Sequence, residues 1–135
     1  MFRAELDSKK PNGNFIDIDP GVLICDAFAY SRIREAVSGE IEILPIQVDN
    51  LEMYVINVVN VVDCLDEDKS HVEYFSDGGV SGIKQYVFKT DLLADVMLFK
   101  IPQSSRTEIY ASDNFRELVL GANLTGLVFQ NVFCE

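Results

Sequence analysis

Residues 22–43, VLICDAFAYSRIREAVSGEIEI, contain the pattern that decides the fold. A β-like run at 22–24 precedes Asp26, whose carboxylate can cap a following helix. The apolar residues that then recur at helical spacing are Phe28, Ile33, Ala36 and Val37. Ser38-Gly39 ends the helix, and apolar residues alternate again from Ile41. The stretch therefore predicts a strand, a helix of about three turns and a second strand.

A segment nearer the C-terminal end repeats this pattern. Residues 111–115, ASDNF, resemble residues 24–28, ICDAF, and each segment follows β-like residues and opens a helix. The distance from the phenylalanine to the next β-like run is thirteen positions in both cases. We therefore predict two related strand-helix-strand units packed about one sheet, with Phe28 and Phe115 both facing that sheet.

The hairpin expected next after the first unit is marked by its turn. Residues 40–48 and 51–59 flank Asp49-Asn50, a pair that favours tight turns, and Pro45 requires an edge strand or a bulge. Further β-like runs occur at 72–75, 83–88, 97–101, 108–111 and 127–133. Strands that follow one another through short turns favour antiparallel pairing.

These elements define the fold class and the domain organisation. We predict an α+β fold with a mainly antiparallel sheet and two helices, the second capped by Ser112 or Asp113. The chain has 135 residues, which fits one domain, and we assign that domain to residues 14–135. Residues 1–13 are polar and are expected to form a tail or a first strand.

The charge of the chain limits the classes of partner. Asp and Glu number 22 against 11 Lys and Arg, so the formal net charge is -11. Such a field repels nucleic acids and anionic membrane surfaces and attracts a basic protein face. The same acidity also serves solubility alone. We expect a basic protein partner, with no nucleic acid and no membrane.

The cysteines and the N-terminal residues indicate the compartment. Cys25, Cys64 and Cys134 have no paired spacing, which argues against a disulfide framework and a zinc site. The N-terminus has no apolar signal region, and no stretch is long and apolar enough to span a membrane. We expect a cytoplasmic protein.

Few residues suggest catalysis. The sole histidine, His71, lies near four acids in the sequence, so a small hydrolase that uses it with a nearby carboxylate is one alternative. The residues around Cys64 indicate a packed thiol. Asp17-Ile18-Asp19 is typical of a strand with one solvent-exposed face. The glycine-rich run at 77–82 lacks the lysine of a phosphate-binding loop. We predict no enzyme, no metal and no cofactor.

The least ordinary stretch is YVINVVNVVDCLDEDKS at residues 54–70, where polar residues interrupt a valine-rich run at every third position. We interpret it as a strand that leaves the sheet and turns within 57–63, with Asn and Asp side chains bonding the freed backbone groups. Four acids of this stretch are expected at the protein surface and are predicted to bind a partner: Asp63, Asp66, Glu67 and Asp68.

Residues 54–70 also carry a resemblance to a known family. Three later segments follow in the family's order: 86–88, 99–102, and 109–118 continuing through 124–129. Together they resemble a bacterial immunity-protein family, number eleven of the immunity series and formerly a domain of unknown function, over about residues 14–135. The resemblance implies a protein that binds and neutralises the cognate toxin of a polymorphic toxin system, and it supplies no catalytic residues. An adaptor for a partner other than a toxin is a further alternative.

Overall fold

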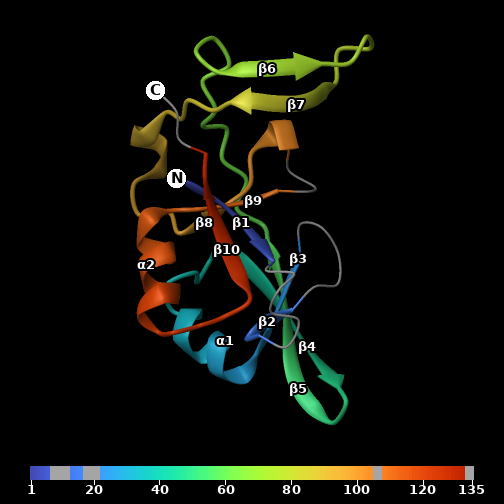
Figure 1. Cartoon of the computed structure of the whole chain (residues 1–135), viewed down its shortest axis with the longest axis vertical. Helices are drawn as coiled ribbons and strands as arrows, with labels where there is room; N and C mark the ends of the chain where they lie inside the picture. The colour runs from blue at the N-terminus through green and yellow to red at the C-terminus, as the bar shows by residue number, and fades with distance from the viewer. Residues whose placement is uncertain (7–12, 17–21, 105–107, 133–135) are drawn as a thin grey trace.

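The computed structural model describes residues 1–6, 13–16, 22–104 and 108–132 (Figure 1). The first sheet has the strand order β2 (Phe15–Ile16), β3 (Val22–Asp26), β5 (Leu51–Val58) and β4 (Ile41–Val48). The second sheet has the order β10 (Leu127–Asn131), β1 (Phe2–Leu6), β9 (Ile109–Ala111) and β8 (Leu98–Phe99). The remaining two strands, β6 (His71–Tyr74) and β7 (Val80–Gln85), form a separate hairpin.

Two α-helices and two short 3₁₀ turns complete the fold. They are α1 (Ala27–Ile33), α2 (Asp113–Gly121), η1 (Thr90–Leu93) and η2 (Pro102–Ser104). All strand pairs in the described part of the chain are antiparallel. The predicted α+β class with two helices is confirmed, although the strands divide into three sheets where one was expected. The first helix is also shorter than predicted, because the chain continues as turns after Ile33.

The two strand-helix-strand units share an unusual connection. Strands β3 and β4 both pair antiparallel with β5, so they run parallel to each other with β5 between them. In the second sheet, β9 and β10 are likewise parallel, with β1 between them. Each unit is therefore a split β-α-β arrangement, in which a third strand separates the two strands joined by the helix.

The registers of the two units match residue by residue. In the first unit, Cys25, which is one position before the helix cap Asp26, lies opposite Tyr54. Ile41 lies opposite Val58. In the second unit, the corresponding pairs are Ala111 with Phe2 and Leu127 with Leu6. Strand β1, from the N-terminal end, therefore occupies the place in the second unit that β5 occupies in the first.

The helix caps correct the alignment that the sequence suggested. Asp26 caps α1 by accepting a hydrogen bond from the Ala29 N–H at 2.8 Å, and Ser112 caps α2 by accepting one from the Phe115 N–H at 3.2 Å. Asp26 therefore corresponds to Ser112, and the residue equivalent to Phe115 is Ala29, which is also fully buried. The prediction that Phe28 faces the sheet was wrong. This ring is 50% exposed, because it lies one position earlier in its helix.

The two units are joined by hydrogen bonds that each donates to the other. The Phe15 N–H, at the start of β2, donates to the carbonyl of Thr125, just before β10. In the opposite direction, the Met97 and Leu98 N–H groups, at the start of β8, donate to the Glu40 carboxylate, just before β4. Gly126 allows the first contact, because a Cβ there would lie 2.3 Å from the Phe15 carbonyl oxygen.

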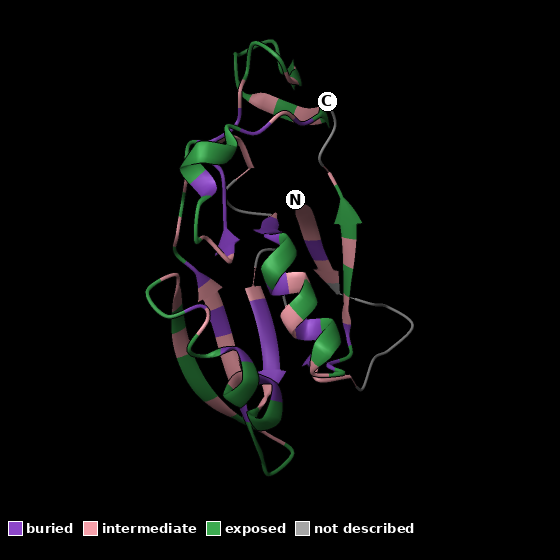
Figure 2. Ribbon diagram, turned by 90° about the vertical axis from the view of Figure 1, so that its left-hand side faces the viewer, coloured by how far each residue is buried: buried purple, intermediate pink, exposed green. Residues whose placement is uncertain are grey.

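The two units share one apolar core. Both helices contribute to it, through Ala29 and Ile33 of α1 and through Phe115 and Val119 of α2 (Figure 2). A second cluster lies on the other face of the second sheet, around Tyr110. Its other fully or mostly buried members are Cys64, Leu65, Tyr86, Phe88, Leu93, Phe99 and Ile101. The chain between β5 and β9 thus covers the second sheet and supports the β6–β7 hairpin.

Candidate functional site

Residues 59–65, which we call the crossing segment, leave β5 and cross to the second sheet. Backbone contacts fix them there. Asn60 is the main link, since its carbonyl accepts a hydrogen bond from the Lys100 N–H at 2.8 Å and its side-chain amide donates to the Leu98 carbonyl at 3.2 Å. Cys64 and Leu65 are buried in the second cluster. The Asn60 side chain therefore bonds a backbone carbonyl of β8, which differs from the predicted bond to backbone groups freed within 57–63, and Asn57 remains inside β5.

After Leu65 the chain makes a tight turn over residues 66–70, which we call the acidic turn. The Asp66 carboxylate accepts a hydrogen bond from the Lys69 N–H at 3.2 Å, and the Asp66 carbonyl accepts one from the Ser70 N–H at 2.8 Å. The Ser70 hydroxyl contacts both backbone groups of Val87. These bonds hold the turn against the chain that follows β7.

The four predicted binding acids differ in their exposure and in their place along the chain. Glu67 and Asp68 are exposed on the acidic turn, where Asp66 is half-buried and shapes the turn. Asp63 is also exposed but precedes the buried pair Cys64 and Leu65, so it lies outside the turn. Glu67 and Asp68 are therefore the acids of this set best placed to meet another molecule.

The β6–β7 hairpin adjoins the acidic turn and ends in exposed aromatic residues. It lies at one end of the molecule, opposite the β4–β5 hairpin (Figure 1). Tyr74 and Phe75 are 54% and 61% exposed, and the Tyr74 hydroxyl donates to the Glu67 carboxylate at 3.3 Å. These two rings were not among the residues predicted to bind a partner. Their exposure could have been inferred, because successive side chains of a strand point to opposite faces. Adjacent aromatic residues beside the turn-rich run 76–79 therefore cannot both face a core.

His71 lies at the base of the same hairpin, at an open depression of about 290 Å³ that Glu67 and Ser70 also line. The histidine is exposed at the start of β6. The Ser70 hydroxyl, which also lines the depression, is already bonded to the Val87 backbone on both its donor and acceptor sides. A hydrolase with a serine nucleophile needs that serine aligned with a base, and these contacts hold Ser70 in the turn instead.

The two described cysteines are buried thiols. Burial raises the pKa of Cys25 to about 12 and that of Cys64 to about 11. At neutral pH both groups are therefore protonated, which is the unreactive form. Cys134 and the pair Asp17 and Asp19 lie outside the described residues.

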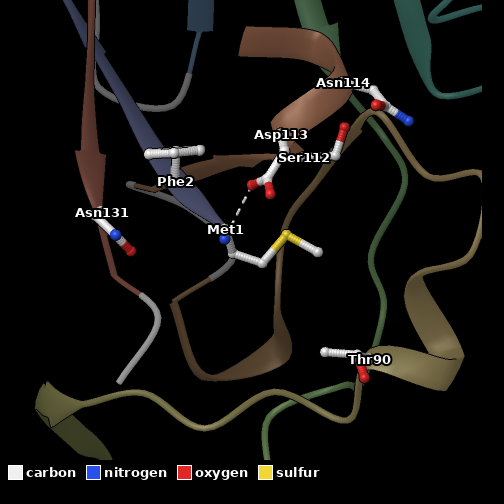
Figure 3. Close-up of a pocket in the computed structure, with 7 residues that line it drawn as sticks. All are labelled: Met1, Phe2, Thr90, Ser112, Asp113, Asn114 and Asn131. Carbon is white, nitrogen blue, oxygen red and sulfur yellow. Dashed lines mark hydrogen bonds and ion pairs between the residues drawn. The ribbon is translucent and has the colours of Figure 1, made fainter. Parts of the chain in front are cut away.

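A hollow lies between the starts of β1 and α2 and the end of β10 (Figure 3). It has a volume of about 500 Å³, and its lining residues are Met1, Phe2, Thr90, Ser112, Asp113, Asn114 and Asn131. The Ser112 hydroxyl accepts the Phe115 N–H of the helix cap and donates to the Met97 sulfur at 3.6 Å. This hydroxyl therefore serves the helix cap.

Across the residues that the structure describes, no three or more His, Cys, Asp or Glu side chains gather as metal ligands would. Nor is any helix in the described ranges long and apolar enough to cross a membrane.

The elements described above can be compared with known families. A model described as the immunity protein family Imm11 matches residues 44–133, two thirds of the chain, from the middle of β4 past the end of β10. No curated protein matches the chain. The match includes the crossing segment, the acidic turn, the β6–β7 hairpin and the whole described part of the second unit except β1. The chain therefore belongs to the immunity protein family Imm11.

Proposed function

We propose that this protein acts in the cytoplasm as a non-catalytic inhibitor, which binds and neutralises the cognate toxin of a polymorphic toxin system. The observation that carries this function is the family match over residues 44–133. The formal net charge of -11 supports a toxin partner with a basic face, because opposite charge steers two proteins into encounter.

The acids Asp63, Asp66, Glu67 and Asp68 are proposed to meet that basic face. Glu67 and Asp68 are exposed, and the hydrogen bonds of Asp66 and Ser70 hold the turn that presents them. Exposed acids of this kind mainly raise the association rate, because their attraction acts before the surfaces touch. Asp63 extends the negative field along the crossing segment.

The function is tested by co-expression. The immunity function implies a cognate toxin encoded next to the gene for this chain. That toxin is expressed in bacteria with and without this protein, and survival is counted. We expect cells to die with the toxin alone and to survive when both proteins are made. Death in both cases, with both proteins soluble, would contradict the immunity function. Survival without a purified complex would contradict inhibition by binding.

The role of the acidic turn has a kinetic test. The Asp66→Asn/Glu67→Gln/Asp68→Asn variant removes three charges and keeps an oxygen acceptor at position 66 for the Lys69 N–H. The screening length is about 8 Å at physiological ionic strength, so added salt should slow wild-type association and affect this variant less. Stopped-flow mixing with the neighbouring toxin measures both salt slopes.

A matched control removes three exposed acids elsewhere: Glu35→Gln/Glu42→Gln/Glu117→Gln. We expect this variant to retain more of the salt dependence than the turn variant, because its acids lie on other elements. Equal salt slopes for the wild type and the turn variant would exclude the acidic turn from the interface. The immunity function itself would then still stand on the co-expression result.

The hydrolase alternative is tested separately through His71. We expect His71→Ala to protect cells as well as the wild type, since inhibition by binding needs no catalytic histidine and His71 is exposed at the start of β6. Loss of protection by a folded His71→Ala variant that still binds the toxin would favour catalysis over simple inhibition.

A further inference from the structure

The β6–β7 hairpin lies at one end of the molecule (Figure 1), and two of its aromatic side chains are exposed to solvent. Tyr74 is the last residue of β6 and Phe75 begins the loop, and more than half of each side chain is exposed. Aromatic rings in such positions forfeit the stabilisation that burial gives, so a pair of them at a surface commonly marks an interaction site. Tyr and Trp are also the residue types that dominate the binding energy of interfaces.

The loop holds the backbone of Phe75 in one conformation. The Phe75 N–H donates to the Gly79 carbonyl at 2.6 Å, and the Gly78 N–H donates to the Phe75 carbonyl at 3.0 Å. The Asp77 carboxylate accepts a third bond, from the Gly79 N–H, at 2.8 Å. Gly78 has a φ of +93°, a conformation that glycine adopts without strain. Because the loop is already ordered, little conformational entropy is lost when Phe75 binds a partner.

Acidic residues flank the two rings in the sequence, and one of them contacts Tyr74. Residues 66–85 contain five acids and two lysines, a formal charge of -3 with neutral histidine. Glu67 accepts the Tyr74 hydroxyl hydrogen, which ties the acidic turn to the first ring. Glu73 pairs with Lys84 across the hairpin at 3.7 Å, and Asp77 lies within the loop. An aromatic centre inside an acidic rim complements a basic surface that contains an apolar pocket.

Two other exposed apolar sites fit a basic partner less well. Phe28 is 50% exposed, but the Arg32 guanidinium lies 5.2 Å from its ring centre, which gives that surface a positive charge. Leu44 and Leu51 are about as exposed as Phe75 and lie on the β4–β5 hairpin at the opposite end. Leucine is under-represented among the residues that dominate interface energies.

We propose, building on the toxin-binding function above, that Tyr74 and Phe75 are the anchor of the toxin interface. The two rings enter an apolar pocket on the basic face of the toxin, and Glu67, Glu73 and Asp77 form the charged rim around it. The anchor governs the lifetime of the complex, whereas the acids govern its rate of formation.

The experiment measures dissociation from the toxin domain encoded beside this gene, made catalytically inactive and immobilised on a sensor surface. The variants are Tyr74→Ala, Phe75→Ala and the double variant, and the matched control is Leu44→Ala/Leu51→Ala. We expect the double variant to dissociate about thirty-fold faster or more, with an association rate within about threefold of the wild type. The control should dissociate at the wild-type rate.

Thermal melting checks that each variant is folded, which we expect because both rings are exposed. A second measurement leaves the rest of the hairpin intact: a photo-reactive benzophenone side chain in place of Phe75 should cross-link to the toxin, and one in place of Leu44 should not. If the wild type binds and a folded double variant dissociates at the wild-type rate, the anchor is refuted and the toxin-binding function stands. Cross-linking from Leu44 alone would also refute the anchor. If the wild type fails to bind the toxin, the toxin-binding function fails, and the anchor fails with it.

Discussion

Replacing Glu40 with alanine should weaken the contact between the two units and lower the stability of the whole protein. The Glu40 carboxylate accepts hydrogen bonds from the Met97 and Leu98 N–H groups, both at 3.1 Å, at the start of strand β8. The Asn60 side-chain amide lies 3.5 Å from the same carboxylate. Alanine removes the acceptor and leaves two backbone donors without it, one of them on the fully buried Leu98.

The size of the effect follows from these two bonds. An unsatisfied buried donor costs about 1–3 kcal/mol, and Glu40 is itself half-buried, so water can partly replace its carboxylate. We therefore expect Glu40→Ala to lower the free energy of unfolding by about 2–4 kcal/mol. Glu40→Gln retains one acceptor oxygen and should lower it by roughly half as much. Against a total stability of about 5–15 kcal/mol, either change is large enough to measure.

Urea unfolding followed by far-ultraviolet circular dichroism measures this loss, because the chain contains no tryptophan to report by fluorescence. With a slope of about 2 kcal/mol per M, the midpoint for Glu40→Ala should fall by roughly 1–2 M. Glu42→Ala is the control, since Glu42 is exposed on β4, the strand that begins directly after Glu40. This control should change the free energy of unfolding by no more than about 0.5 kcal/mol. Equal midpoints for the two alanine variants would refute a bridging role for Glu40.

Two further predictions concern burial. Phe115→Ala should lower the free energy of unfolding by about 3–5 kcal/mol, because the buried ring leaves a cavity. Phe28→Ala should change the free energy of unfolding by less than about 1 kcal/mol, because that side chain is exposed. Urea unfolding of both variants measures the difference. In a Cys134→Ser background, Cys25 and Cys64 should react with Ellman's reagent at pH 8 only after denaturation, because burial keeps their pKa values at about 12 and about 11 and both thiols remain protonated at that pH. Rapid release of two equivalents of thionitrobenzoate from the folded protein would contradict that burial.

The strand-helix-strand pattern was predictable because it is local. The cap at Asp26 and the spacing to the next strand both lie within residues 22–43, and the structure places a strand, a capped helix and a strand there. The error at Phe28 arose from matching the wrong capping residue. Both Ser112 and Asp113 are capping residue types, and only the hydrogen bond from the Phe115 N–H to the Ser112 hydroxyl selects between them.

Two features could not be predicted from the sequence. The position of β1 depends on contacts between residues far apart in the chain, and the exposure of Tyr74 and Phe75 depends on an interruption of the two-residue period of a strand. Nothing local to Phe2–Leu6 indicates that this strand lies between β10 and β9, whose residues come more than a hundred positions later. At the β6–β7 hairpin, the pairing register shifts between Glu73 and Tyr74. This irregularity interrupts the two-residue period on which strand predictions rest, so the outward position of the aromatic residues was not evident.

The place of β1 also sets the order in which the molecule can assemble. Strands β4 and β5 are joined by two residues, Asp49 and Asn50, whereas β1 and β10 are joined by about 120 residues. Each doubling of a closed loop adds about 0.6 kcal/mol of lost chain entropy, so closing the longer loop costs roughly 3–4 kcal/mol more in an otherwise unfolded chain. The first sheet can form from residues made early during synthesis, while the second must wait until β10 leaves the ribosome. A released chain truncated before residue 127 would therefore carry a complete first sheet beside a second sheet in which β1 lacks β10 along one edge.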